Sequence, residues 1–341
     1  APKCRVWPRD PNRPLRSRAQ AAMTNSLVLH LGDVKSGSTS IQTALKTGAW
    51  RSPGRTLHYP VRRGELHHCG LAATLFRPGR RRFAATALER VAASVRGVDA
   101  DVAVISAEWF ESVDPEVLAE ALERHFPEHA RDARLIAYVR PHAERVTSSF
   151  QMNLRLGFFT GTLERFHAAK LAEGRFLYAD RLARWRRVFG DRYEVRPMIR
   201  ERLHRGCVVR DFLSYALGTE EVELAAEPDA NVSLGVEDLA VMRELHLAAR
   251  PGPRAARRVA QALEATRGAA ATPIRLHAAL AARVVEDYRE DAERCDALFF
   301  EGAPLSEALA AADRKAVPEA QSFRAEDHLA PEELRRLRAL L

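Results

Sequence analysis

The chain has 341 residues, 46% of them hydrophobic, which is enough to bury one large core or two small ones. Its formal charge of +8 does not indicate a nucleic-acid-binding protein, because six basic residues and one acid within positions 1–22 supply +5 of it. No apolar run approaches the roughly 20 residues of a membrane-spanning helix. The four scattered cysteines form no CxxC pair and indicate reduced thiols in a cytoplasmic protein.

Positions 1–22 are rich in arginine and proline and lack the apolar segment of a secretory signal. We expect a disordered basic extension there, with Met23 as the natural start. An arm that contacts a polyanion is the alternative. We expect an α/β core over 23–218 and a helical C-terminal part over 219–341 that packs on the same domain.

The stretch 26–45, SLVLHLGDVKSGSTSIQTAL, has three parts. SLVLHL is a short apolar run that predicts a buried strand. A glycine-containing loop with one lysine and four hydroxyl residues follows, and apolar residues then recur at helical spacing up to Gly48, a plausible helix end. A strand, a glycine loop and a helix hold a phosphate on the helix N-terminus, where backbone N–H groups and the helix dipole favour an anion.

The loop differs from the P-loop of nucleotide triphosphatases, G-x-x-x-x-G-K-[ST]. Gly32 and Gly37 have the required separation, but Ser38 stands where the lysine belongs, and Lys35 precedes the second glycine by two residues. The chain has 48 arginines and only five lysines. A lysine in this loop therefore indicates a need for a compact charge on a flexible stem.

Two further strands are predicted to end in polar residues. The run 101–111, DVAVISAEWFE, places Glu108 after a buried strand, and RLIAYV ends at Arg140. Ligand sites in open α/β sheets lie at such carboxyl ends. A helix should follow from Pro141 to about residue 156, with Ser148 eight residues after the arginine. A Walker-B strand would instead end in an aspartate that holds Mg²⁺.

His67 and His68 open a small apolar helix after the extended segment LHYP at 57–60. The pair has no third metal ligand at usable spacing. The histidines either contribute to a functional site or cap the helix as a solvated pair. Other expected elements are a strand within 193–203 and helices over 80–96, 116–125, 178–190, 206–218, 235–267, 275–300 and 331–341.

The Lys35 loop and the Arg140–Ser148 spacing together resemble two motifs of sulfotransferases that use 3′-phosphoadenosine 5′-phosphosulfate (PAPS). The loop is similar to the bacterial branch that reads roughly HIGxxKTGTTSxQ, with Asp33-Val34 where that branch often has a residue followed by proline. The matching residues are His30, Gly32, Lys35, Gly37, Thr39, Ser40 and Gln42. The resemblance covers about residues 26–218 and implies a P-loop-like sulfotransferase fold, a mostly parallel sheet flanked by helices, with a helical C-terminal cap.

The resemblance also implies roles for individual residues. Lys35 and the loop residues Ser36, Gly37, Ser38, Thr39 and Ser40 would bind the 5′-phosphosulfate, and Arg140 with Ser148 would bind the 3′-phosphate. Glu108, His67 or His68 would take the proton of an acceptor hydroxyl or amine. PAPS would be the co-substrate, without a metal, and the acceptor could be a carbohydrate, a lipid or a small alcohol. A kinase with a degenerate P-loop and a non-catalytic nucleotide-binding protein are the alternatives.

Overall fold

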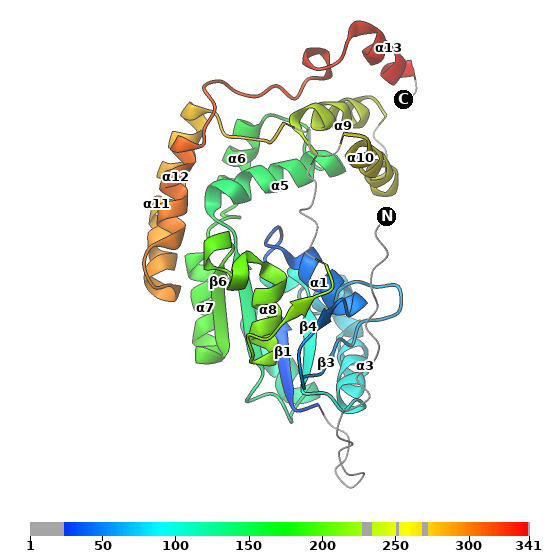
Figure 1. Ribbon diagram of the computed structural model, residues 1–341, viewed down its shortest axis with the longest axis vertical. Helices are drawn as coiled ribbons and strands as arrows, with labels where there is room; N and C mark the ends of the chain where they lie inside the picture. The colour runs from blue at the N-terminus through cyan, green and yellow to red at the C-terminus, as the bar shows by residue number, and fades with distance from the viewer. Residues whose placement is uncertain (1–23, 227–233, 250–251, 268–271, 340–341) are drawn as a thin grey trace. The chain divides into compact units, whose positions relative to one another are not determined.

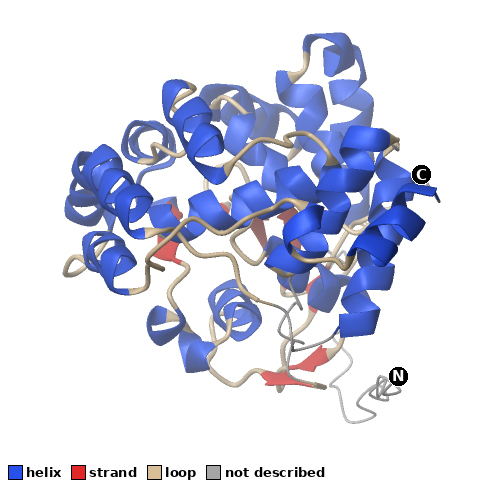
Figure 2. Cartoon of the chain, turned by 90° about the horizontal axis from the view of Figure 1, so that it is seen from above, coloured by secondary structure: helices blue, strands red, loops and turns tan. Residues whose placement is uncertain are grey.

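The computed structural model describes residues 24–226, 234–249, 252–267 and 272–339. The chain divides into two compact units, one formed by the residues up to 140 and by 180–228, the other by 141–179 and the residues from 229 onward. Every strand within the described residues belongs to the first unit, and the second unit is helical. Figure 2 colours the strands red among the helices, which are blue. The predicted extension over 1–22 lies outside the described residues.

The first unit contains a five-stranded sheet in the order β3-β4-β1-β5-β6, and all neighbouring strands run parallel (Figure 1). Along β1, Val28 lies opposite Val104 of β4, and His30 lies opposite both Ser106 of β4 and Ile136 of β5. Strands that are buried on both faces form continuous apolar runs, which is why they could be predicted. The strands are β1 (Ser26–His30), β3 (Leu57–His58), β4 (Val102–Ser106), β5 (Arg134–Val139) and β6 (Tyr193–Pro197).

Helices cover the sheet. On one face, α1 (Ser38–Thr47) and α8 (Val208–Leu217) pack with alternate side chains of β1, β4 and β5 in a single apolar cluster. The intervening strand side chains point to the opposite face and are also buried. The predicted α/β fold with a mostly parallel sheet flanked by helices is therefore confirmed. The unit's other helices are α2 (Cys69–Phe76), α3 (Ala84–Arg96), α4 (Pro115–His125) and α7 (Ala179–Phe189).

Two local features differ from the expected elements. The start of the predicted helix over 80–96 is a 3₁₀ segment, Pro78–Phe83, that leads into α3. A separate two-stranded antiparallel sheet joins β2 (Trp50–Arg51) to β7 (Glu223–Leu224).

The strand order identifies where a ligand would bind to the first unit. From β1 the chain proceeds toward the β3 edge of the sheet, and from β5 it proceeds toward the β6 edge. β1 and β5 are neighbours, so their connections diverge at this point. In open α/β sheets, ligands bind at the carboxyl ends of strands where the connections diverge in this way. The residues that follow β1 and β5 include Lys35 and Arg140.

The second unit consists of packed helices. α5 (His142–Leu156) contacts α6, α9, α10, α11 and α12, and α11 packs along α12. Rings from α5, α6 and the C-terminal segment meet at Phe150, which contacts Phe159, Phe166 and Phe323. The predicted C-terminal helices are thus present, and 235–267 forms two of them. The helices are α6 (Leu163–Ala172), α9 (Val236–Ala248), α10 (Pro253–Arg267), α11 (Ala278–Phe299), α12 (Pro304–Arg314) and α13 (Pro331–Ala339).

Candidate functional site

The loop between β1 and α1, residues 31–37, starts as a continuation of the sheet. The Leu31 N–H donates to the Ile136 carbonyl at 2.9 Å, and the Asp33 N–H donates to the Tyr138 carbonyl at 3.2 Å. In return, the Tyr138 N–H donates to the Gly32 carbonyl at 3.0 Å. These bonds to β5 fix the position at which the loop leaves the sheet.

Three residues of this loop have left-handed backbone conformations. Gly32, Lys35 and Gly37 have φ values of 84°, 68° and 83°. Glycine adopts this region without strain, but a lysine there carries a steric cost. Strain of this kind persists only where the surroundings impose it, and it is concentrated at functional sites. The predicted candidate Lys35 is therefore held in a costly conformation in the middle of the loop.

The loop hydroxyls divide into two groups. Ser36 Oγ and Ser38 Oγ are buried and both donate to the Asp33 carbonyl, at 2.5 and 3.2 Å. These two hydroxyls thus brace the turn from inside. Thr39 is exposed and Ser40 is half-buried at the start of α1. A hydroxyl contact with a ligand is therefore easier for Thr39 and Ser40 than for the two inner serines.

The N-terminus of α1 has no side-chain cap among the described residues, and its N-cap residue is Gly37. The first N–H groups of a helix have no acceptor within the helix. These N–H groups and the positive end of the helix dipole favour a bound anion. A side chain at Gly37 would bring a Cβ within 2.9 Å of Val208, so the loop also requires a glycine for packing.

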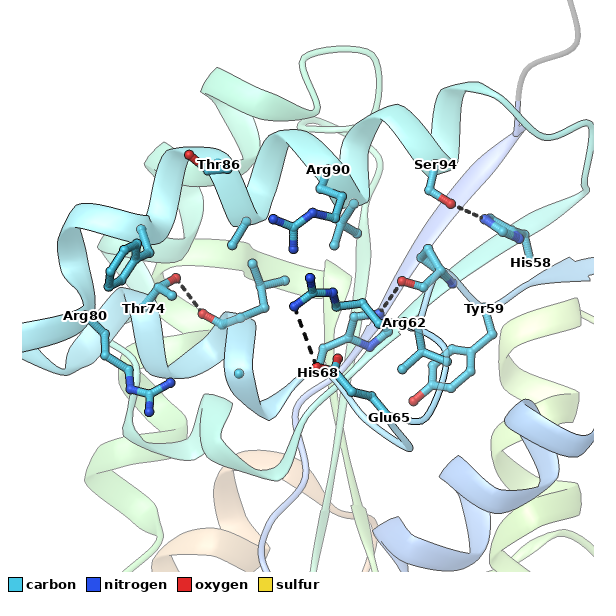
Figure 3. A pocket seen from close by; sticks show the side chains of 17 residues that line it. His58, Tyr59, Arg62, Glu65, His68, Thr74, Arg80, Thr86, Arg90 and Ser94 are labelled. Atoms are coloured by element: carbon cyan, nitrogen blue, oxygen red, sulfur yellow. Dashed lines mark hydrogen bonds and ion pairs between the residues drawn. The ribbon is translucent and has the colours of Figure 1, made fainter.

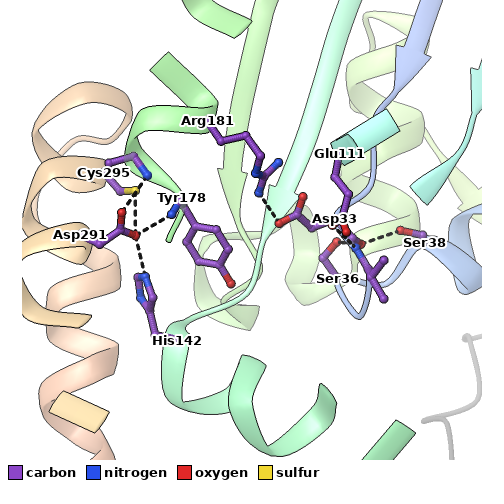
Figure 4. Close-up of polar contacts among 11 residues, drawn as sticks. Asp33, Ser36, Ser38, Glu111, His142, Tyr178, Arg181, Asp291 and Cys295 are labelled. Atoms are coloured by element: carbon purple, nitrogen blue, oxygen red, sulfur yellow. Dashed lines mark hydrogen bonds and ion pairs between the residues drawn. The ribbon is translucent and has the colours of Figure 1, made fainter. Parts of the chain in front are cut away.

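Side-chain contacts to Arg181 and Glu111, which the sequence analysis did not predict, hold the loop in place. The buried Asp33 carboxylate accepts a 2.7 Å bond from Arg181 of α7, and Glu111 accepts a 3.2 Å bond from the Val34 N–H (Figure 4). Burial acts to lower the pKa of Arg181, but Asp33 and Glu111 outweigh it and the pKa is raised. Arg181 therefore remains a cation whose charge compensates Asp33.

The motif residues His30 and Gln42 have a structural explanation. His30 Nδ1 lies 2.8 Å from Ser106 Oγ, and Gln42 Nε2 donates to the same hydroxyl at 3.1 Å. All three side chains are buried, and burial lowers the pKa of His30 to about 3. A neutral hydrogen-bonded group thus ties β1, β4 and α1 together beneath the loop.

Glu108 follows β4 in a 3₁₀ turn, Glu108–Ser112, and is half-buried. A Cβ added to Gly32 would lie 2.7 Å from the Glu108 Cα, so the loop and the glutamate backbone are in direct contact. This close approach requires glycine at position 32 and places the Glu108 backbone beside the loop.

The residue after Glu108, Trp109, is stacked by Arg77, with 4.4 Å between the guanidinium carbon of Arg77 and the centroid of the Trp109 ring.

The two histidines have different surroundings. The buried His68 places Nε2 3.1 Å from the Pro60 carbonyl and accepts a bond from the Ser106 N–H at Nδ1, at 3.1 Å. Burial lowers the pKa of His68 to about 4. His67 is half-buried, and its Nδ1 accepts a long 3.4 Å bond from the Cys69 N–H at the start of α2. The ring of His68 thus joins the Pro60 and Ser106 backbones and forms no side-chain cap hydrogen bond to α2 among the described residues, and these contacts weaken the case for His68 as a base.

Arg140 directly follows β5, as predicted, and is half-buried. Pro141, where the helix was expected to begin, is the N-cap of α5, and the helix begins one residue later, at His142. Ser148 lies on α5 in the second unit, half-buried, and its Oγ donates to the Arg145 carbonyl at 3.3 Å. Because Arg140 and Ser148 belong to different units, their convergence on one phosphate stays a prediction.

Within the part of the chain that the structure describes, no group of three or more His, Cys, Asp or Glu side chains could hold a metal ion. In the same residues, no helix combines the length and the apolar character that crossing a membrane requires. Cys69, Cys207 and Cys295 form no disulfide with one another or with any other described residue.

No protein-family model matches the sequence, and no curated protein matches it. Among solved structures, the chain is similar to a sulfotransferase from Alicyclobacillus acidocaldarius, with 17% sequence identity and a TM-score of 0.49. The similarity covers 83% of this chain and 99% of that chain. Both values are low, so the functional proposal rests on the residues of this chain.

Proposed function

We propose that this protein is a sulfotransferase that moves a sulfuryl group from PAPS to a hydroxyl or amine of an acceptor. The observation that carries the proposal is the position of Lys35. It lies in the middle of a phosphate-type loop, two residues before the second glycine, in a left-handed conformation. A lysine at this point leaves the loop nearer the transferred end of the donor than the lysine of a P-loop does.

The donor would bind across the carboxyl ends of β1 and β5. The N–H groups at the start of α1, with Thr39 and Ser40, would hold the 5′-phosphosulfate. Ser36 and Ser38 would contribute through the shape of the turn and through their backbone. Arg140 would bind the 3′-phosphate by a two-pronged, charge-assisted contact, and Ser148 would add a neutral donor. Recognition of the 3′-phosphate would select PAPS over ATP.

In the transfer, the acceptor oxygen or nitrogen forms a bond to sulfur while the bond from sulfur to the 5′-phosphate oxygen breaks. The electron pair of the broken bond remains on the phosphate oxygen, where Lys35 neutralises the growing negative charge. The acceptor proton passes to a base. Positioning and electrostatic stabilisation would supply most of the rate, as in phosphoryl transfer.

We assign the base to Glu108. Its backbone packs on the loop at Gly32, and a half-buried carboxylate can accept a proton. His68 is a weaker candidate because backbone groups contact both of its ring nitrogens. His67 is the remaining alternative.

Incubation with PAPS and pooled acceptors tests the proposal. The pools would contain carbohydrates, hydroxylated lipids, small alcohols and amines, and mass spectrometry would detect sulfated product together with released 3′-phosphoadenosine 5′-phosphate. Sulfation of any pool supports the proposal. Phosphorylation of a pool with Mg·ATP in place of PAPS would instead identify a kinase. Binding of the bisphosphate without transfer to any pool would favour a non-catalytic protein.

A further inference from the structure

A cavity lies in the first unit, between the segment that follows β3 and helix α3 (Figure 3). Its volume is about 600 Å³. Small-molecule sites in proteins have volumes of roughly 300–1,000 Å³. None of the residues assigned above to donor binding lines this cavity, and neither does Glu108, whereas His68, the weaker candidate for the base, does.

The cavity has an apolar floor and wall. Leu71 of α2 and Ala87 and Val91 of α3 line it, and Phe83 stands at the start of α3. Phe83 is 50% exposed, which is high for a large aromatic side chain. Burial of this surface by an apolar ligand body would be favourable, at about 25 cal/mol per Å² of apolar area removed from water.

The charged residues around the cavity are mainly arginines. Arg62, Arg80 and Arg90 line it together with one acid, Glu65, so three positive charges against one negative charge leave a formal charge of +2. In Figure 3, Arg62 and Arg90 point into the middle of the cavity from its two sides. Glu65 lies 3.9 Å from the Arg62 guanidinium, a distance that makes it a weak counter-ion. Two guanidinium groups directed into one cavity favour an oxyanion between them.

Helix α2 separates this cavity from the proposed reaction site. Leu71 and Thr74 of α2 line the cavity. Other residues of the helix face the Glu108 turn: the Cys69 thiol interacts with the Glu108 and Trp109 backbone, and Phe76 packs edge-on against Trp109 at 6.5 Å. The cavity is therefore distinct from the site assigned to the donor and Glu108, and His68 is the candidate residue that it shares with the reaction proposed above.

We propose that this cavity binds a small amphipathic anion, with an apolar body against Leu71, Ala87 and Val91 and a carboxylate, sulfate or phosphate group between Arg62 and Arg90. The apolar wall selects against small inorganic anions, and the arginines select against neutral and cationic amphiphiles. The site depends on neither the donor nor the reaction proposed above.

Calorimetric titration with three probes tests this site. Decanoate has both an apolar body and an anionic group. Acetate lacks the apolar body, and decyltrimethylammonium has an apolar body with a positive charge. We expect saturable binding of one decanoate and no binding of the other two. Equal binding of decanoate and decyltrimethylammonium would overturn the proposal. Binding to phosphatidylglycerol vesicles without binding of decanoate would also overturn it, because the surface would then recognise a membrane.

Substitutions of residues that line the cavity test whether decanoate binds there. Arg90→Gln and Arg62→Gln should each weaken decanoate binding about tenfold, since each removes one charge-assisted contact. Arg81→Gln is the matched control, because Arg81 is exposed, lies in the same 3₁₀ segment as Arg80 and does not line the cavity. Ala87→Phe should fill the cavity and abolish decanoate binding, with 3′-phosphoadenosine 5′-phosphate binding unchanged. Wild-type decanoate affinity in Arg90→Gln and Ala87→Phe would refute the assignment.

Discussion

Asp33 of the first unit and Asp291 of the second are both buried, but their carboxylates accept different numbers of hydrogen bonds (Figure 4). Asp291 of α11 accepts bonds at both oxygens, from His142 Nε2 at 2.9 Å and from the N–H groups of Tyr178 and Ala179 at 2.8 and 2.9 Å. Asp33 accepts from Arg181 at Oδ2, and no described residue bonds its Oδ1.

The backbone around the two aspartates also differs. Asp291 lies among regular helices, whereas Asp33 lies in a loop with a strained lysine and beside an uncapped helix N-terminus. A buried carboxylate that the protein itself satisfies at both oxygens stabilises the fold. A loop that keeps strain and uncapped N–H groups is better explained by binding. The comparison therefore assigns a structural role to Asp291 and a ligand-binding role to the loop that contains Asp33. The following variants test these two roles.

Lys35→Ala should have the largest effect. The lysine is proposed to stabilise charge that appears only in the transition state, so its removal should lower the transfer rate by at least about 10³-fold with the fold intact. Lys46→Ala is the control, because Lys46 is an exposed lysine in the last turn of α1, the helix that follows the loop. The release of 3′-phosphoadenosine 5′-phosphate from PAPS measures the transfer rate of each variant, and circular dichroism checks that each variant is folded. An active, folded Lys35→Ala protein would remove the lysine from the mechanism.

Glu108→Gln should lower the rate by about 10²-fold or more if proton removal occurs in the transition state. The amide keeps the shape of the side chain and cannot act as the base. His67→Ala should cost less. Turnover of both variants at saturating PAPS tests the order, and a larger loss in His67→Ala would transfer the role of base to the histidine.

Asp291→Asn should lower the free energy of unfolding by about 1–3 kcal/mol near neutral pH, because the charge-assisted bonds to His142 and two N–H groups are weakened. Burial acts to raise the pKa of Asp291, but these bonds outweigh it and hold the pKa below the ordinary 3.8. The unfolded chain then takes up the proton first as the pH falls, so this stabilisation is present above pH 3.8 and is lost below it.

Thermal unfolding of Asp291→Asn and the wild type should therefore differ clearly at pH 7 and converge toward pH 3. Asp313→Asn, at an exposed position of α12, is the matched control and should behave as the wild type. A difference in unfolding temperature between Asp291→Asn and the wild type that does not change with pH would contradict the stabilising role of the Asp291 carboxylate.

Arg181→Gln should have the smallest effect of the four, with bisphosphate affinity about tenfold weaker, because the loop would lose the cation that compensates buried Asp33. Arg184→Gln, one turn nearer the helix end and paired only at the surface with Asp114 and Glu116, should change the affinity little. Calorimetric titration of both variants with 3′-phosphoadenosine 5′-phosphate measures these affinities. Equal affinity in Arg181→Gln and the wild type would show that the bracing has no role in binding.

The elements that could be predicted from the sequence are those with a local signal. β1, β4 and β5 are continuous apolar runs, and α1 ends at Gly48 in the left-handed conformation expected of a helix stop. The loop position of Lys35 also follows from its spacing to Gly37. Glu108 could be placed at a strand end, because that requires only the order of residues along the chain.

The supporting contacts could not be predicted, because they join residues far apart in the sequence. Arg181 is 148 positions from Asp33, and Ser106 is 76 positions from His30. Neither pairing leaves a pattern in a single sequence. The weaker case for His68 as a base also depends on the Pro60 and Ser106 backbone groups that contact its ring, and no sequence pattern shows these contacts. The grouping of α5 with the C-terminal helices likewise depends on tertiary packing.

Calorimetric titration with 3′-phosphoadenosine 5′-phosphate, set against Mg·ATP, tests the central claim most directly when wild type and Arg140→Ala are compared. We expect tight binding of the bisphosphate, weak binding of Mg·ATP and a large loss of bisphosphate affinity in Arg140→Ala. Preference for Mg·ATP in the wild type, or bisphosphate binding that is unaffected by Arg140→Ala, would contradict the account.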